Sequence, residues 1–231
     1  MAPIRELASP NCDERPADTR IDMLVIHYTG MTSAQAALAR LTDPAAQVSA
    51  HYLIEEDGGV TRLVPEAKRA WHAGVSSWRG VNGVNACSIG IELANPGHEF
   101  GYRGFTEAQM AALERLAHDI VHRHAIPARN VVGHADVAPA RKMDPGELFD
   151  WRRMAQAGVG LWPETAGADG AGATVGKSDA LPQLAAYGYD TADPTAALVA
   201  FQRHFARHRL DGVADGQTRR VLAALLAVAN V

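Results

Sequence analysis

The chain of 231 residues has little cysteine, a small excess of charge and no long apolar run, and each shortage excludes a class of protein. Cys12 and Cys87 are too few for a disulfide framework or a cysteine-rich zinc site, so we expect two free thiols. Lys and Arg number 22 against 26 Asp and Glu, and the net charge of −4 gives the whole chain no attraction to nucleic acid or to an anionic membrane. No apolar run approaches the roughly 20 residues that a membrane helix needs, so we expect no transmembrane segment.

The N-terminal residues Met1–Leu7 lack the basic region and the apolar core of a secretory signal. We therefore expect the protein to act in the cytoplasm, or in the periplasm or at the envelope if a signal was removed from this chain. With 47% hydrophobic and 21% charged residues, the composition is that of a folded protein and excludes wholesale disorder.

A run of small residues divides the chain in two. Residues 165–178 are mostly Gly, Ala and Thr and offer no side chain that could anchor a core, which predicts a flexible linker. We expect residues 1–164 and residues 179–231 to form two domains, because each part is long enough to fold as a unit.

The first part alternates strand and helix patterns, which predicts an α/β domain with a mixed central sheet flanked by helices. Apolar runs predict strands at 23–27, 88–93 and 130–134, and a hairpin of 51–54 with 60–64. Helices are expected at 33–41 and at 106–124, the second with a capping box of Thr106 and Gln109. Residues 71–87 show no periodicity and predict a long loop, a kind of segment that is often functional.

The second part is predicted to be helical. Helical spacing of apolar residues indicates three helices, at 181–187, 194–207 and 216–229. Three short helices around one apolar core are typical of a small binding domain rather than of an active site.

Two histidines and one aspartate form a candidate metal site. His27 and His134 each end an apolar run, and Asp144 follows ten residues later in a segment that Pro139 and Pro145 stiffen. A single buried histidine is more often bonded to a carbonyl group. Two imidazoles and one carboxylate, however, are the protein ligands of a catalytic Zn²⁺ whose fourth position is open to water. We therefore expect these three residues to hold Zn²⁺.

Two further charged residues have sequence positions suited to catalysis. Glu92 lies within an apolar strand, where a carboxylate costs free energy unless it has a partner or a task. It is either a general base or a carboxylate paired with Lys or Arg. Lys142, two residues before Asp144, could stabilise oxyanion charge, or it could be a solvated loop lysine.

Other polar residues leave their interpretation open. The loop 71–87 contains aromatic and amide side chains that could line a groove for a ligand bearing sugar or peptide, or could serve packing and turns alone. His118 and His122 have the spacing of a helical zinc motif, but Asp119 replaces its glutamate and both rings lie off the apolar face. We expect them not to bind metal.

Several blocks in the same order resemble the zinc-dependent N-acetylmuramoyl-L-alanine amidases of the amidase 2 family. These blocks are Ser9–Asn11, Val25–Thr29, Ser49–Ile54, Ala70–Gly74, Ser88–Leu93, Gly133–Pro139 and Arg141–Gly146. Residues 179–231 resemble a three-helix peptidoglycan-binding domain, through Tyr187–Tyr189, Ala200–Phe205 and Asp215–Thr218.

The resemblance implies a function and a role for each candidate residue. Zinc would be held by His27, His134 and Asp144, with Glu92 acting on the zinc-bound water and Lys142 stabilising the tetrahedral intermediate. Contacts with peptidoglycan or a muropeptide fragment are expected from Tyr28, Trp71, His72, Asn85 and Arg141. The bond cut would be the amide between the lactyl group of N-acetylmuramic acid, or its 1,6-anhydro form, and L-alanine of the stem peptide. The alternative is a non-catalytic peptidoglycan-recognition protein with the same fold.

Overall fold

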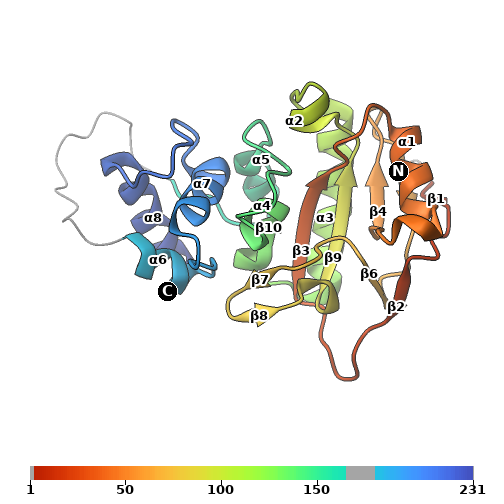
Figure 1. Cartoon of the computed structure of the whole chain (residues 1–231), viewed down its shortest axis with the longest axis horizontal. Coiled ribbons are helices and arrows are strands. Elements are labelled where there is room, and N and C mark those ends of the chain that lie inside the picture. Colours follow the sequence, from red (N-terminus) through yellow and green to blue (C-terminus); the bar gives the residue numbers. More distant parts are fainter. Residues whose placement is uncertain (1–2, 165–179, 231) are drawn as a thin grey trace.

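The computed structural model describes residues 3–164 and 180–230, so the predicted linker 165–178 lies outside the described residues. The centre of the protein is a six-stranded sheet in the order β1-β5-β4-β9-β3-β10 (Figure 1). The strands are β1 Arg5–Glu6, β3 Met23–Tyr28, β4 Tyr52–Ile54, β5 Val60–Arg62, β9 Ser88–Leu93 and β10 Val131–Gly133. Strand β4 is antiparallel to β5 and parallel to β9, and β9, β3 and β10 are parallel neighbours. The predicted mixed α/β fold is confirmed.

One face of the sheet is covered by helix α3, Glu107–His124, together with α5, Trp151–Gln156. Because side chains alternate along a strand, Leu24 and Ile26 of β3 point to this face and pack with the apolar side of α3. Helix α3 begins as predicted, with the Thr106 hydroxyl accepting from the Gln109 main-chain nitrogen and the Gln109 side chain accepting from the Thr106 nitrogen.

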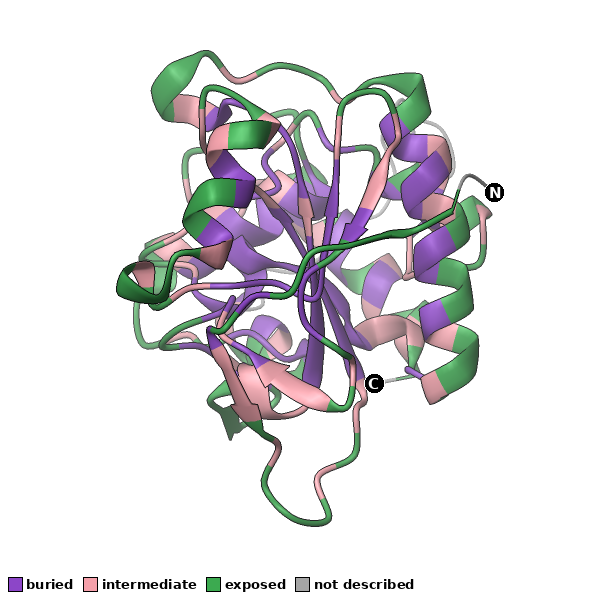
Figure 2. Ribbon diagram, turned by 90° about the vertical axis from the view of Figure 1, so that its right-hand side faces the viewer, coloured by how far each residue is buried: buried purple, intermediate pink, exposed green. Residues whose placement is uncertain are grey.

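The opposite face carries two separate groups of helices. Helix α1, Ala34–Thr42, covers the sheet near β4, where it packs with Leu53. The three C-terminal helices lie beyond β10, at the other end of the sheet (Figure 1). Figure 2 shows the central strands buried along their length while the helices keep one side exposed.

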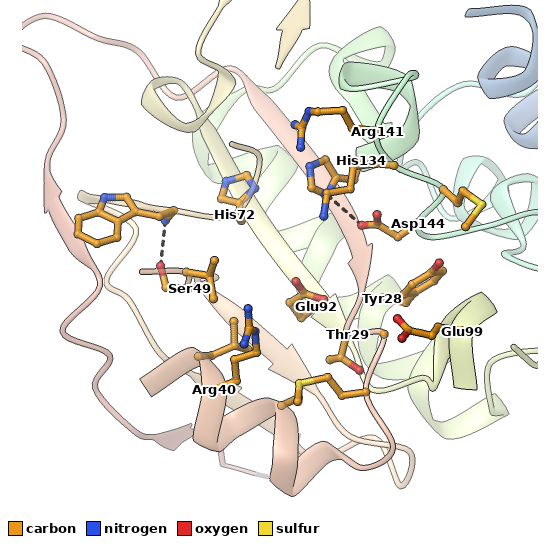
Figure 3. Close-up of a pocket in the computed structure, with 18 residues that line it drawn as sticks. Tyr28, Thr29, Arg40, Ser49, His72, Glu92, Glu99, His134, Arg141 and Asp144 are labelled. Atoms are coloured by element: carbon orange, nitrogen blue, oxygen red, sulfur yellow. Dashed lines mark hydrogen bonds and ion pairs between the residues drawn. The ribbon is translucent and has the colours of Figure 1, made fainter. Parts of the chain in front are cut away.

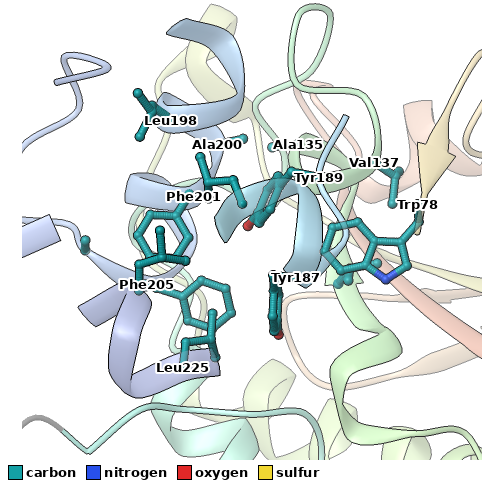
Figure 4. Close-up of a cluster of buried hydrophobic side chains, with 14 of the residues drawn as sticks. Trp78, Ala135, Val137, Tyr187, Tyr189, Leu198, Ala200, Phe201, Phe205 and Leu225 are labelled. Atoms are coloured by element: carbon teal, nitrogen blue, oxygen red, sulfur yellow. The ribbon is translucent and has the colours of Figure 1, made fainter. Parts of the chain in front are cut away.

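The C-terminal helices have nearly the predicted bounds: α6 Ala180–Tyr187, α7 Pro194–Phe205 and α8 Gly216–Ala229. Their apolar core is not confined to themselves. Tyr187, Tyr189 and Phe201 belong to one cluster with Trp78 and Val137 of the first part of the chain (Figure 4). The centroid of the Trp78 ring lies 5.7 Å from that of Tyr187 and 5.2 Å from that of Tyr189. We call this group, with the other members of the same cluster, the shared core.

Several short elements escaped prediction. They are β2 Cys12–Glu14, which pairs with β6 Lys68–Ala70, the helices α2 Gly97–Phe100 and α4 His134–Val137, and the 3₁₀ turns η1 Pro44–Ala46, η2 Val84–Ala86 and η3 Ala128–Asn130. The segment 71–87 is not a plain loop, because it contains the hairpin of β7 Ser77–Trp78 with β8 Val81–Asn82 and the turn η2. Elements of two to four residues are too short to show a period in sequence. Within the described residues, no helix is both long enough and apolar enough to span a membrane.

Candidate active site

Three parallel strands bring the candidate residues to one edge of the sheet. His27 of β3 is the register partner of Glu92 on β9, and both side chains leave the face opposite α3. Gly133, the last residue of β10, pairs with Ile26, so the next residue, His134, lies level with His27. His134 was predicted to end a strand; instead it is the first residue of α4. The carboxyl ends of parallel strands are where α/β sheets place their sites.

The three predicted metal ligands meet at this edge. The Nδ1 atom of His27 lies 3.0 Å from Nδ1 of His134 and 3.0 Å from Oδ2 of Asp144, and the last two atoms are 3.1 Å apart. All three residues are buried. Asp144 returns to the sheet through the turns after α4, where its carbonyl oxygen accepts a hydrogen bond of 2.8 Å from the Ala135 nitrogen.

The second nitrogen of His134 determines where its proton sits. Nε2 lies 3.0 Å from the carbonyl oxygen of Ala73, which can only accept. A neutral His134 ring would therefore carry its proton on Nε2, which leaves the lone pair on Nδ1 free. A carbonyl partner of this kind is the usual way in which proteins orient a metal-binding histidine.

A chain of hydrogen bonds determines which nitrogen of His27 carries the proton. The Ser88 hydroxyl donates to the Val84 carbonyl at 2.7 Å, so its oxygen accepts from Nε2 of His72 at 3.0 Å. Nδ1 of His72 is then an acceptor, and it receives the proton on Nε2 of His27 at 3.0 Å. Burial lowers the pKa of His27 to about 4 and holds that of His72 below its usual value, so both rings are neutral. Nδ1 of His27 is also left with a free lone pair.

The donor set fits a divalent cation. In their neutral forms the two imidazoles turn a lone pair toward each other and toward the Asp144 carboxylate at about 3 Å, an arrangement that a cation would stabilise. Ligands of a tetrahedral Zn²⁺ stand about 2.0–2.2 Å from the ion and hence about 3.3 Å from one another. The three groups match Zn²⁺ in number, type and spacing.

A pocket of about 460 Å³ opens above this edge (Figure 3). Its lining includes most of the predicted site residues: Tyr28, Trp71, His72, Glu92, His134, Arg141, Lys142 and Asp144. His27 lies beneath the lining and is 1% exposed. Asn85 does not line the pocket; its side-chain oxygen accepts from the main-chain nitrogens of His72 and Ala73, at 3.2 and 2.8 Å, and holds that loop in place.

Glu92 stands near the middle of the pocket with one oxygen unsatisfied. Its Oε2 atom is buried and has no hydrogen-bond partner among the described residues. Burial raises the pKa of Glu92 to about 8, the charge of Asp144 adds to the rise, and the Lys142 ammonium group opposes it. Within residues 3–164 and 180–230 the structure gives this carboxylate no ion pair with Lys or Arg, so a paired structural carboxylate is not what is found.

The two basic residues before Asp144 differ in their contacts. Arg141 donates from its guanidinium group to the carbonyl oxygens of Ala73 and Val75, which ties the turn to the 71–74 loop. Lys142 is partly exposed and lines the pocket.

Two charged residues at the pocket were not predicted. Arg40 lies on α1 and Glu99 on α2, at the margins of the same pocket (Figure 3). Neither has a local sequence signal, because Arg40 reads as a solvated last-turn cation and Glu99 as a loop residue. His118 and His122, the second histidine pair, are exposed on α3, away from this site.

Comparisons with known proteins agree on one family. The model of the Amidase_2 family, described as N-acetylmuramoyl-L-alanine amidase, matches residues 17–147. The chain is 41% identical to the N-acetylmuramoyl-L-alanine amidase AmiD of Escherichia coli (strain K12), over 90% of this chain and 83% of that protein. It is 37% identical to the 1,6-anhydro-N-acetylmuramyl-L-alanine amidase AmpD of Citrobacter freundii, over 67% of this chain and 89% of that protein.

Two similar solved structures hold a ligand. AmiD from E. coli, in complex with the substrate anhydro-N-acetylmuramic acid-L-Ala-D-gamma-Glu-L-Lys, superposes with a TM-score of 0.81 at 39% identity and covers 93% of each chain. AmpDh3 from Pseudomonas aeruginosa, in complex with anhydromuramic pentapeptide, gives a TM-score of 0.80 at 34% identity over 92% of this chain and 94% of that chain.

Proposed function

Because the chain belongs to the amidase 2 family of N-acetylmuramoyl-L-alanine amidases, we propose that it uses Zn²⁺ to cleave the amide between 1,6-anhydro-N-acetylmuramic acid and L-alanine. One observation carries the proposal: two imidazoles and a carboxylate oxygen converge beside Glu92, whose Oε2 atom has no hydrogen-bond partner in the part of the chain that the structure describes. The choice of the anhydro sugar is supported by the ligands of the two similar structures, which are anhydromuropeptides.

The residues would share the work of amide hydrolysis. His27, His134 and Asp144 would hold Zn²⁺, which supplies an acidified water and a polarised carbonyl when it is bound. Glu92 takes the proton of the attacking water and delivers it to the leaving amine nitrogen. A cation beside Glu92 favours its ionised form, which opposes the effect of burial on its pKa and makes it a base at neutral pH.

Lys142 acts on the other side of the reacting bond. Attack of water turns the amide carbonyl oxygen into an oxyanion, and an ammonium group at the pocket wall stabilises that charge. The attraction between the ammonium group and the oxyanion is stronger at a pocket wall than in bulk solvent, because the effective dielectric constant is lower there.

The replacement Glu92→Gln tests the proposal. An amide of the same shape cannot take a proton, so we expect kcat on a soluble anhydromuropeptide to fall by about 10²- to 10⁴-fold while the zinc content of the protein is unchanged. Glu114→Gln is the matched control, because it makes the same change on helix α3, outside the pocket lining, and it should keep the wild-type rate. Both variants are compared by product release and by metal analysis.

Three outcomes would contradict parts of this proposal. Wild-type turnover by Glu92→Gln would exclude Glu92 as the base. Binding of the muropeptide without hydrolysis, in a protein that takes up no zinc, would favour the non-catalytic recognition protein. Faster product release from intact sacculi than from the soluble anhydromuropeptide would show that sacculi, and not the soluble fragment, are the preferred substrate.

A further inference from the structure

The last turn of helix α7, with the turn that follows it, reaches the two segments that carry His134 and Asp144 of the candidate metal site. His204 contacts α4, which begins at His134. Arg203 and Arg207 contact the segment that follows Asp144. The sequence places these residues in the helical part that resembles a wall-binding domain, where no link with the metal site is expected.

The first contact is a buried ion-pair geometry. Nδ1 of His204 lies 2.7 Å from Oδ2 of Asp136, and both side chains are at most 5% exposed. The remaining partners of Asp136 are the Gly133 nitrogen on Oδ2 and the Tyr189 hydroxyl on Oδ1, each at 2.7 Å. Two of its three partners therefore come from the C-terminal helical part. Since Gly133 and Asp136 flank His134, this carboxylate fixes the backbone that aims the His134 ring.

The His204 ring is itself held rigidly. It stacks on Trp151 with centroids 3.8 Å apart and planes at 19°, and on Phe205 at 3.7 Å and 6°. A ring held between two aromatic neighbours presents its Nδ1 atom in one direction. The carboxylate of Asp136 thus has a fixed donor rather than a mobile one.

The second contact holds the Asp144 segment. Arg207 donates from Nη1 to the carbonyl oxygens of Glu147 and Phe149, both at 3.0 Å, and Nε of Arg203 lies 3.3 Å from the Glu147 carboxylate. That carboxylate also lies 3.2 Å from Nε2 of His98, whose Nδ1 is 2.8 Å from the Tyr28 hydroxyl at the pocket. The contacts of α7 therefore extend to the pocket wall.

The two held segments also pack directly against each other. A β-carbon at Gly133 would lie 2.6 Å from Cδ of Pro145, which shows that there is no slack between them. A shift of either segment would be passed to the other, because close-packed groups transmit displacement.

We propose that the C-terminal end of helix α7 and the turn after it form a positioning element of the metal site, with His204 holding the His134 segment and the pair Arg203 and Arg207 holding the Asp144 segment. The inference rests on the proposed function, since it assumes a metal at that site. In this chain α7 buries Asp136, and removing its donor leaves a buried carboxylate short of a partner.

The test uses the full chain and reads the metal site directly. His204→Ala should weaken Zn²⁺ binding about tenfold in competition with a chelator, the lower end of the range for residues that orient metal ligands. It should also change the visible absorption spectrum of the Co²⁺-substituted protein, which reports ligand geometry. His204→Asn should restore most of the Zn²⁺ affinity and most of the wild-type Co²⁺ spectrum, because its amide can donate to Asp136 from a similar position.

Leu225→Ala is the control for a general loss of stability. Leu225 is fully buried in the shared core and makes no polar contact with the metal-site segments (Figure 4). We expect this variant to unfold at lower urea concentration yet to bind Zn²⁺ with the wild-type affinity and to give the wild-type Co²⁺ spectrum.

A double variant tests the positioning role if His204→Ala does not fold. Arg203→Met with Arg207→Met removes the second contact from a partly exposed surface and should weaken Zn²⁺ binding several-fold. Wild-type affinity and spectrum in the folded double variant, and in His204→Ala where it folds, would overturn the positioning role and leave the proposed function intact. A wild-type chain that binds neither metal would overturn the proposed function, and this inference with it.

Discussion

A single glycine and a single serine decide which nitrogen of His27 is available to a metal. The β-carbon of any other residue at Gly90 would lie 2.5 Å from Cγ of His72, so only glycine lets that ring approach the sheet. Ser88 then ends the chain of hydrogen bonds by donating to a carbonyl group. His72, expected to contact substrate, is thus placed so that it also orients His27. Gly90 and Ser88 therefore act on the metal site only through His72.

The replacement Ser88→Ala should disturb the hydrogen bonds that run from His27 through His72 to Ser88. Without the serine oxygen, the Nε2 proton of His72 has no acceptor, and the tautomer with the proton on Nδ1 competes with the bond from His27. We expect the affinity for Zn²⁺ to fall by about tenfold. Chelator competition measures the affinity, and ¹⁵N NMR of the imidazole nitrogens measures the tautomers.

Ser76→Ala is the matched control for this variant. Its hydroxyl is buried nearby, donates to the Gly74 carbonyl and accepts from the Val84 nitrogen, and it has no hydrogen bond to a histidine among the residues that the structure describes. An equal loss of zinc affinity in both serine variants, or unchanged imidazole spectra in Ser88→Ala, would argue against the relay.

At the scale of elements, His51 joins three strands. It directly precedes β4, its Nδ1 accepts from the Gly90 nitrogen of β9 at 3.0 Å, and its Nε2 lies 3.2 Å from the Lys68 carbonyl of β6. These bonds need a neutral ring with its proton on Nε2. Burial lowers the pKa of His51 to about 3, so the ring stays neutral in the folded protein well below the pKa of a free histidine.

This burial makes the stability of the sheet depend on pH. Between about pH 6.5 and pH 3 the unfolded chain binds a proton at His51 that the folded chain does not bind, so the free energy of unfolding falls as the pH falls. From pH 7 to pH 5 we expect a loss of about 2 kcal/mol from this residue, at about 1.36 kcal/mol for each pKa unit.

Urea unfolding of the wild type and of His51→Asn, both with a chelator present, measures this contribution. Asn keeps a hydrogen-bonding oxygen near the position of Nδ1 but does not titrate in this range. The stability advantage of the wild type should therefore shrink by about 2 kcal/mol between pH 7 and pH 5. Parallel pH profiles for the two proteins would show that His51 is not the source.

At the scale of the whole molecule, the shared core joins the two predicted domains. The aromatic residues of the C-terminal helices pack on Trp78 and on α4, on the same sheet face that carries His27 (Figure 4). A small independent domain would be expected to keep its apolar residues to itself. The division at residues 165–178, the wall-binding role of residues 179–231 and the cytoplasmic location stay predictions.

The shared core predicts a single cooperative unfolding transition. In hydrogen exchange under increasing urea, amides of α8 and of β9 should lose protection together. Phe201→Ala should lower the free energy of unfolding measured at both sets of amides by the same amount, about 3–5 kcal/mol for a fully buried phenylalanine. Two separate transitions, with β9 unaffected by the change at Phe201, would indicate that the C-terminal helices fold as an independent domain.

The sequence by itself determined the local elements and the chemistry on offer. Apolar runs placed His27 and Glu92 on strands, and the capping box placed the start of α3, because both signals depend on residues close together in the sequence. The fold class followed from the order of these elements. The bounds of α8 were predicted to the residue, since Asp215 before it and the apolar spacing within it are local features.

Only the tertiary structure decided how these residues meet. The parallel register sets Glu92 beside His27, and the carbonyl of Ala73 and the hydroxyl of Ser88 choose the metal-facing nitrogen of each histidine. The contact of His204 with Asp136 joins residues 68 positions apart, and Asn85 supports a loop instead of lining the pocket. No local pattern encodes such contacts, because the direction of a hydrogen bond depends on which distant backbone and side-chain groups packing brings within 3 Å.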